Sequence, residues 1–194
     1  YFPDKKSLVR SGRNLDNLVR DLGIVVKAAG SNLKGVYFCM NPVNIPPGQD
    51  VAAKDKDVVR RRWLLIDVDA TRPADTNATD EEKAAALAVM DAVFGYLNGL
   101  SFPAPVQIDS GNGYHLLYRI DLPNDEESKK LVQGILNGLA DLHDTPNATV
   151  DRKVYNASRI TKLPGTPVRK GPYSRQRPYR MARLMNAPDQ VEVV

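Results

Sequence analysis

Two aspartates at the end of an apolar run are the residues in this sequence most suited to chemistry. Asp67 and Asp69 follow the run Trp63–Ile66 and are separated by one residue. A buried strand is the simplest host for such a run, and residues i and i+2 of a strand project from the same face. Carboxylates held that close repel each other unless a cation lies between them, and Mg²⁺ or Mn²⁺ prefers such oxygen ligands. The pair alone is equally compatible with an ordinary acidic strand end.

A glycine-containing turn supplies a second set of polar groups. The sequence from Ser110 to His115 places a hydroxyl and an imidazole around Gly111, Asn112 and Gly113. Glycines allow a backbone to approach a ligand closely and to turn its N–H groups toward an anion. Asn-Gly is also a strong hairpin signal, so an ordinary turn followed by a histidine on a strand is the alternative interpretation.

A third acid lies in a strongly basic segment. Residues 150–183 contain ten Lys or Arg and one acid, Asp151. Asp151 would act either as an ion-pair partner of Arg152 or Arg159, or as a third oxygen ligand beside the Asp67 pair. Arg159 and Lys162 are suited to binding phosphate. Interleaved tyrosines make the segment typical of a nucleic-acid surface, and a solubilising basic face is the alternative. We expect nucleic-acid contacts from Arg152, Lys153, Arg169, Lys170, Tyr173 and Arg175.

The elements that must position these residues alternate between two periodicities. Thr79 and Glu82 form a capping-box pattern, which predicts a helix with Leu87, Met90, Phe94 and Leu97 facing inward. A second helix is predicted after Asn124-Asp125, and its inward residues would be Leu131, Val132, Ile135, Leu136, Leu139 and Leu142. Another helix is predicted over 14–29, and strands over 35–40, 63–69, 106–108, 114–120 and 179–185. The mixture predicts an α/β or α+β domain with antiparallel hairpins flanked by helices.

Composition sets further limits. The 194 residues are 42% hydrophobic with a net charge of +4, which suits a single domain over 1–194, built of one core or two subdomains. One cysteine and two histidines exclude a disulfide, a zinc ribbon and a three-histidine metal site within this chain. No run is long enough to span a membrane, so a cytoplasmic location is expected. Because the first residue is Tyr1 and not Met, we expect the chain to be a piece of a longer protein.

Taken in order, the three blocks resemble the catalytic motifs of the archaeo-eukaryotic primase superfamily, and most closely the primase-polymerase domains of phages, plasmids and mobile elements. Asp67-x-Asp69 matches the first motif, Ser110-Gly-x-Gly-x-His115 the second, and Asp151 the third. The stretches 156–166 and 169–171 are also similar to the phage and plasmid branch, and the likeness extends over about residues 35–185.

The resemblance implies a DNA-directed nucleotidyltransferase with an α/β unit and an RRM-like unit. It implies that Asp67, Asp69 and Asp151 hold two Mg²⁺ or Mn²⁺ ions. It also implies that an NTP or dNTP is bound by Ser110, Gly111, Asn112, Gly113, His115, Arg159 and Lys162. Single-stranded DNA would be template and primer, in replication of a phage, plasmid or mobile element in a bacterial or archaeal host. Many family members carry a zinc-binding element and a fused helicase, so a helicase is an expected partner.

Two other functions use the same residues differently. A metal-dependent nuclease would need the carboxylates but no triphosphate pocket. A DNA-binding or replication-initiation module without catalysis would use the basic segment and keep the acids for structure. Substitution of Asp67 or Asp69 separates these alternatives, because only the enzymes would lose their function.

Overall fold

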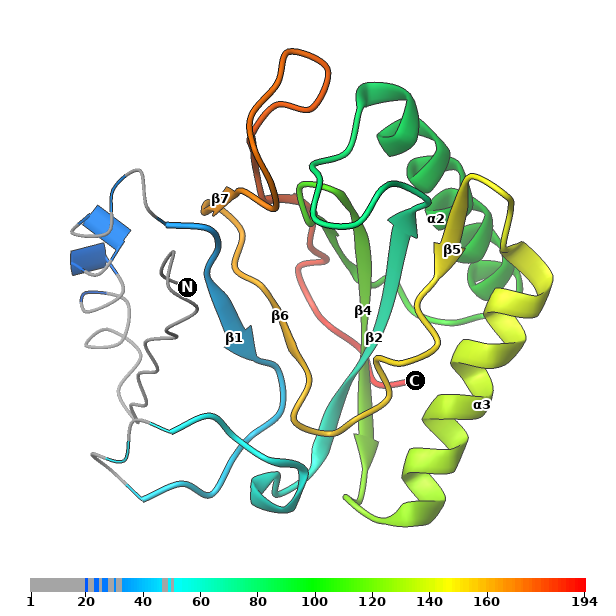
Figure 1. The fold of residues 1–194 in the computed structure, drawn as a ribbon. Helices are drawn as coiled ribbons and strands as arrows, with labels where there is room; N and C mark the ends of the chain where they lie inside the picture. Colours follow the sequence, from blue (N-terminus) through cyan, green and yellow to red (C-terminus); the bar gives the residue numbers. More distant parts are fainter. Residues whose placement is uncertain are drawn as a thin grey trace.

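The computed structural model of the chain describes residues 20, 23–24, 26–27, 30, 33–46, 49 and 51–194. The helix that the sequence predicts over 14–29 lies mostly outside these residues. Within them the order of elements is β1 (Tyr37–Cys39), a 3₁₀ turn (Asp55–Asp57), β2 (Arg61–Ala70), α2 (Asp80–Gly99), β3 (Val106–Asp109), β4 (Gly113–Leu122), α3 (Glu126–His143), β5 (Ala148–Val150), β6 (Ile160–Lys162), β7 (Pro167–Val168), β8 (Arg180–Met181) and β9 (Arg183–Asn186). Figure 1 shows their arrangement.

A five-stranded antiparallel sheet is the centre of the fold. Its strand order is β5-β2-β4-β3-β9, so the apolar run that contains Trp63 occupies an interior strand, as predicted. In the register of β2 and β4, Asp67 lies opposite His115 and Asp69 lies opposite Gly113. Because cross-strand partners share a face of a sheet, the carboxylates and the imidazole project from the same side.

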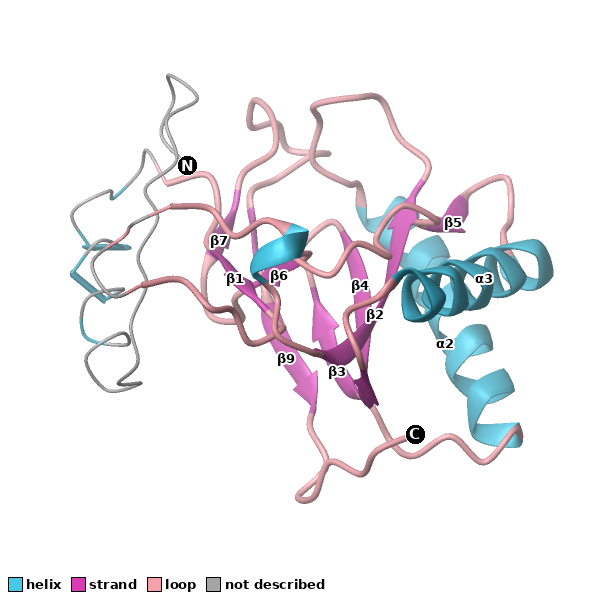
Figure 2. Cartoon of the chain, turned by 90° about the horizontal axis from the view of Figure 1, so that it is seen from below, coloured by secondary structure: helices cyan, strands magenta, loops and turns pink. Residues whose placement is uncertain are grey.

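The two long helices cover the opposite face of this sheet, and they begin where the sequence predicts. The side chain of Thr79 accepts a hydrogen bond from the N–H of Glu82, and Glu82 accepts one from the N–H of Thr79, which completes the capping box of α2. Asp125 caps α3 by accepting a hydrogen bond from the N–H of Ser128. Figure 2 shows both helices on one side of the sheet, so the class is α+β with antiparallel sheets.

The predicted inward faces of the helices need correction. In α3 the buried stripe passes through Val132, Leu136 and Leu139, whereas Leu131 and Leu142 are 52% and 61% exposed. The helix contacts mainly β5 and the neighbouring α2, so only a narrow strip of its surface is buried. Leu131 and Leu142 lie about 100° around the helix axis from the centre of that strip and therefore face solvent. In α2 the buried face consists of Ala86, Val89, Met90, Val93 and Leu97, and the predicted Leu87 and Phe94 are only partly buried beside it.

A second layer of strands covers part of the sheet face from which Asp67, Asp69 and His115 project. Strands β1 and β6 pair antiparallel, with Tyr37 opposite Lys162, and β7 pairs with β8. Figure 2 shows β1 and β6 on the side of the sheet away from the helices. The chain between residues 34 and 39 and the chain after Asp151 therefore meet above the ends of β2 and β4. Among the described residues, no helix has the length and apolar character needed to cross a membrane.

Candidate functional site

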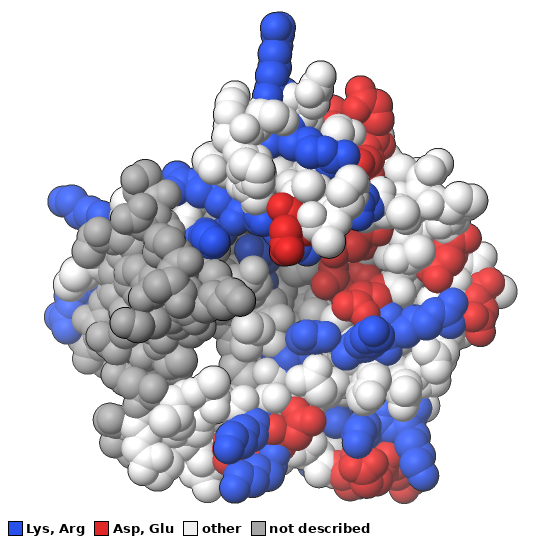
Figure 3. Space-filling model, in the orientation of Figure 1, with Lys and Arg blue, Asp and Glu red and all other residues white. Residues whose placement is uncertain are grey.

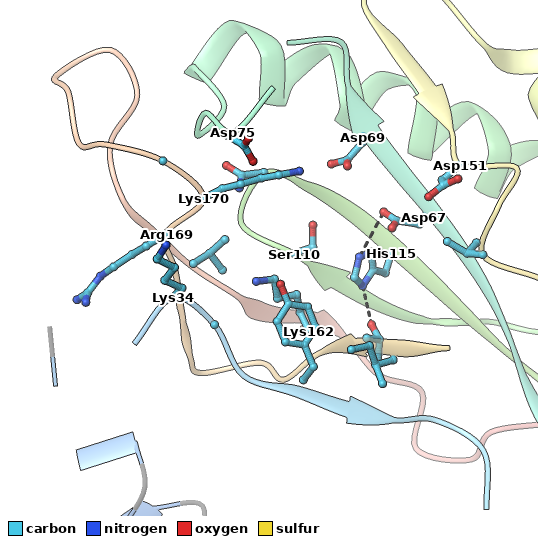
Figure 4. A pocket seen from close by; sticks show the side chains of 18 of the residues that line it. Lys34, Asp67, Asp69, Asp75, Ser110, His115, Asp151, Lys162, Arg169 and Lys170 are labelled. Atoms are coloured by element: carbon cyan, nitrogen blue, oxygen red, sulfur yellow. Dashed lines mark hydrogen bonds and ion pairs between the residues drawn. The ribbon is translucent and has the colours of Figure 1, made fainter. Parts of the chain in front are cut away.

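A cavity of about 900 Å³ lies between the five-stranded sheet and the β1–β6 layer. Asp67 and Asp69 line one part of it, next to His115 from β4. Figure 4 shows the three predicted acids, Asp67, Asp69 and Asp151, grouped on one side and Lys34 and Lys162 on the other, while Lys170 reaches from the rim loop toward Asp69. In the space-filling view of Figure 3, acidic side chains gather near the middle of this face, with Lys and Arg around them. The cavity is therefore divided into an acidic side and a basic side.

His115 is held by two neighbours and is buried. Its Nε2 lies 3.3 Å from Oδ1 of Asp67, and its Nδ1 lies 2.8 Å from Oγ1 of Thr161, which is also buried. A histidine with both nitrogens engaged has a fixed ring orientation. Thr161 of β6, which lies far away in the sequence, therefore orients the His115 ring, and His115 in turn orients the carboxylate of Asp67.

The two carboxylates of β2 have opposite tendencies to ionise. Burial opposes the charge on Asp67, but the adjacent His115, together with Arg159 and Lys170, outweighs burial and holds the pKa of Asp67 below its ordinary value. For Asp69, burial and then repulsion from Asp67 raise the pKa above its ordinary value, although Arg72 and Lys170 act in the other direction. Oδ1 of Asp69 lies 3.3 Å from the Nη1 of Arg72. An added cation between the carboxylates would relieve this repulsion.

Asp151 lies next to Asp67 because the pairing of β5 with β2 continues one step past the end of β5. Its N–H donates to the carbonyl of Asp67 at 2.8 Å, and its side chain lines the same cavity. Its Oδ1 accepts a hydrogen bond of 2.8 Å from the N–H of Lys153. Within the part of the chain that the structure describes, no three His, Cys, Asp or Glu side chains are close enough to hold a metal ion among themselves.

The glycine turn is packed against the protein itself. The N–H of Gly111 donates to Oδ1 of Asp109, and the N–H of Gly113 donates to Oγ of Ser110. A Cβ on Gly111, whose φ is +95°, would lie 2.7 Å from Val168, and one on Gly113 would lie 2.2 Å from the carbonyl oxygen of Val68. These glycines thus permit close packing around the site, and their N–H groups are already used.

Two other side chains of the turn do line the cavity. Ser110 and Asn112 are buried at its wall, beside His115. Oδ1 of Asn112 accepts a hydrogen bond of 2.8 Å from the N–H of Ala78, directly before the cap of α2. The turn is therefore fixed to the start of that helix, and its polar side chains reach the cavity from the β3–β4 hairpin.

The basic side of the cavity is formed mainly by residues after β5. Arg159, Lys162 and Lys170 line it, and Lys170 points toward the carboxylates in Figure 4. Nη2 of Arg159 donates to the carbonyl of Lys153 at 3.0 Å. The N–H of Lys170 donates to Oδ1 of buried Asn77, which fixes the start of the loop after β7.

The predicted nucleic-acid contacts are distributed over different parts of the surface. Arg152 turns toward α3, where it lies 2.7 Å from Asp141 and 3.2 Å from Asp144. Arg169 lines the cavity, but its side chain points away from the carboxylates in Figure 4. Lys153 and Arg175 are exposed, and Tyr173 is 63% exposed with its ring 5.5 Å from that of Tyr179.

Sequence patterns did not point to several of the residues that line the cavity or support it. Their segments are distant from the motifs, and no spacing pattern connects them. Lys34 and Tyr37 come from the chain around β1, Arg72 and Asp75 from the loop after β2, and Thr161 from β6. Asp75 has a φ of +53°, and a Cβ on Gly171 would lie 2.0 Å from its carbonyl oxygen, so the two loops at the rim pack tightly.

Comparisons with known proteins identified no relative of this chain. No protein-family model, no curated protein and no solved structure matches the chain.

Proposed function

We propose that this chain is the catalytic domain of a DNA primase-polymerase. It would join an NTP or dNTP to a 3′-hydroxyl on single-stranded DNA, with Mg²⁺ or Mn²⁺. The observation that carries the proposal is the division of one cavity of about 900 Å³ into a side with Asp67 and Asp69 and a side with Lys34 and Lys162, with Lys170 reaching from the rim toward Asp69. A nucleoside triphosphate with a divalent cation has the complementary charges, because its phosphates bind cations and its metal binds carboxylates.

The residues present fit a hard divalent cation. Asp67 and Asp69 project together, and the raised pKa of Asp69 reflects burial and a repulsion that a cation would remove. Mg²⁺ in nucleotide enzymes is commonly held by one or two carboxylates together with substrate phosphates, so a pair of acids is sufficient. Asp67 and Asp69 would hold the ion, and Asp151 stands beside them. When bound, the metal would polarise the reacting phosphate and stabilise the departing oxygen.

The remaining residues of the cavity have separate tasks in this proposal. His115 and Thr161 keep the carboxylate of Asp67 in one orientation. Arg159, Lys162 and Lys170 would neutralise the charge on the triphosphate, and the low dielectric of a partly enclosed cavity strengthens that effect. The exposed ring of Tyr173, beside Tyr179, would offer a base of the template a stacking surface outside the cavity.

The experiment is primer extension and de novo synthesis on single-stranded DNA with labelled NTPs or dNTPs. Mg²⁺ and Mn²⁺ are offered separately, and wild type is compared with Asp69→Ala. The matched control is Asp91→Ala, because Asp91 is an exposed carboxylate on α2, on the far side of the sheet. We expect product from wild type and from the control, none from Asp69→Ala, and unchanged DNA binding in all three.

Other outcomes would assign the cavity differently. Degradation of the template that depends on Asp69 would contradict polymerisation and establish a nuclease. Tight DNA binding by all three proteins, with no product under any metal or nucleotide, would contradict catalysis and leave a binding module.

A further inference from the structure

Lys162 differs from the other cations of the cavity in how it is held. Its Nζ lies 4.2 Å from the centre of the Tyr37 ring, on the neighbouring strand β1. A Cβ on Gly35 would lie 2.6 Å from Nζ, so the missing side chain there leaves room for the ammonium. Among the described residues, no carboxylate lies within ion-pair distance of it. The ammonium thus lies over the Tyr37 ring in the space left by Gly35, and its hydrogens are available to a ligand.

The surroundings of Lys162 make its proton easy to release. Burial, followed by repulsion from Lys170, lowers the pKa of Lys162 to about 8, while Asp69 and Asp67 act in the opposite direction. At neutral pH the amine is therefore mostly protonated, and proton loss is only slightly uphill. A donor of this kind is effective when its pKa lies near the working pH. The titratable and charged groups around it are Lys34, Tyr37, Asp67, Asp69, His115 and Lys170.

We propose that Lys162 is the general acid of the nucleotidyl transfer, donating a proton to pyrophosphate as it departs. This inference rests on the proposed function. The 3′-hydroxyl oxygen forms a bond to the α-phosphorus while the bond from that phosphorus to the α,β-bridging oxygen breaks. The electron pair of the broken bond stays on the bridging oxygen, which takes a proton from Nζ. The 3′-hydroxyl gives its proton to water, and the neutral amine recovers one from solvent.

The neighbouring cations are less suited to this transfer. Arg159 carries a guanidinium, which does not release a proton in proteins, so it serves to neutralise charge. Lys170 points toward Asp69, on the acidic side of the cavity, where the reacting α-phosphate would bind. Lys162 stands on the other side of the cavity, where the β- and γ-phosphates would lie if the metal held the α-phosphate.

The test measures how strongly the rate depends on the leaving group. Single-turnover incorporation is followed with dNTPs whose β,γ-bridging oxygen is replaced by CH₂ or CF₂, because the fluorinated leaving group is the weaker base. Wild type, Lys162→Arg and Lys162→Gln are compared with Lys130→Arg, an exposed lysine of α3. Thermal melts check folding, and dNTP affinity is measured with Ca²⁺ in place of the active metal.

If Lys162 donates this proton, the incorporation rate of wild type depends little on the basicity of the leaving group. We expect both Lys162 variants to be slower with the CH₂ compound by about a hundredfold, and to recover much of that loss with CF₂. Lys162→Arg keeps the charge and should keep the dNTP affinity. Equal leaving-group dependence in wild type and Lys162→Arg would overturn the inference while the proposed function stands. Absence of product from wild type and Lys130→Arg alike would overturn both.

Discussion

Asp69 carries an electrostatic cost in the folded protein that the unfolded chain does not have. Burial and Asp67 raise its pKa, so the folded state holds the proton more tightly than the unfolded chain, whose value is about 3.8. The stability that this group contributes is therefore complete below that value and is lost as pH rises through the folded-state pKa. At neutral pH the folded protein is less stable than it would be without this charge.

Replacing Asp69 with Asn should therefore stabilise the metal-free protein. We expect the unfolding temperature at pH 7 in EDTA to rise by a few degrees, and the gain to shrink as pH falls through the raised folded-state pKa of Asp69, because the wild-type carboxyl then takes up its proton. Mn²⁺ should stabilise wild type and have little effect on the variant. Scanning fluorimetry measures both effects, with Asp91→Asn as the control. A variant less stable than that control at pH 7 would contradict the assigned repulsion.

The contact between Thr161 and His115 predicts a second effect at the level of one residue. Thr161→Val keeps the shape of the side chain but leaves Nδ1 of a buried histidine without its partner at 2.8 Å. The expected cost is about 1–3 kcal/mol in the free energy of unfolding, measured by urea denaturation. Thr149→Val, at an exposed position of β5, is the matched control and should be nearly neutral. Equal costs in the two variants would show that the His115 contact does not hold.

At the scale of elements, the pairing of β2 with β4 depends on a glycine. A Cβ on Gly113 would lie 2.2 Å from the Val68 carbonyl oxygen and 2.6 Å from Oδ1 of Asp69. Gly113→Ala should therefore separate the strands at Asp69, lower stability and disturb the acidic side of the cavity. The control is Gly95→Ala, at an exposed position inside α2 where an added Cβ would meet nothing within 4 Å. It should raise the free energy of unfolding by about 1 kcal/mol, because alanine favours a helix more than glycine does. Thermal unfolding compares the two variants. If Gly113→Ala were as stable as wild type, the pairing that places Gly113 of β4 opposite Asp69 of β2 would be wrong.

Local patterns predicted the elements whose signals are contained in a short stretch. The strand that bears Asp67, the hairpin around Asn112 and both helix caps were found because apolar runs, turn residues and capping boxes act locally. The β1–β6 layer could not be connected in advance, since its strands have three residues each and are more than 100 residues apart. For the same reason Tyr37 and Thr161 were missed, and Leu131 was assigned to a face that tertiary packing leaves exposed.

At the scale of the whole molecule, the basic segment is divided by ion pairs with the helices. Arg177 forms a two-point contact with Glu82 of α2, with both N–O distances 2.7 Å, and Arg180 pairs with Asp80. Arg152 pairs with acids at the end of α3. The loop after β7 is thereby fastened to α2, and the acids of the helices offset a share of the charge that the sequence shows as one continuous block.

This division predicts which cations contribute to DNA affinity. Each contact with a phosphate of a single strand contributes about 0.7 to the slope of log affinity against log salt concentration. Arg175→Gln should reduce that slope by about this amount, because Arg175 is exposed in the loop beside the cavity rim. Arg152→Gln should leave the slope near wild type, because its guanidinium is already paired with Asp141 and Asp144. Fluorescence anisotropy of a labelled oligothymidylate over a salt series measures both variants. A larger loss of slope for Arg152→Gln would instead place the strand along α3.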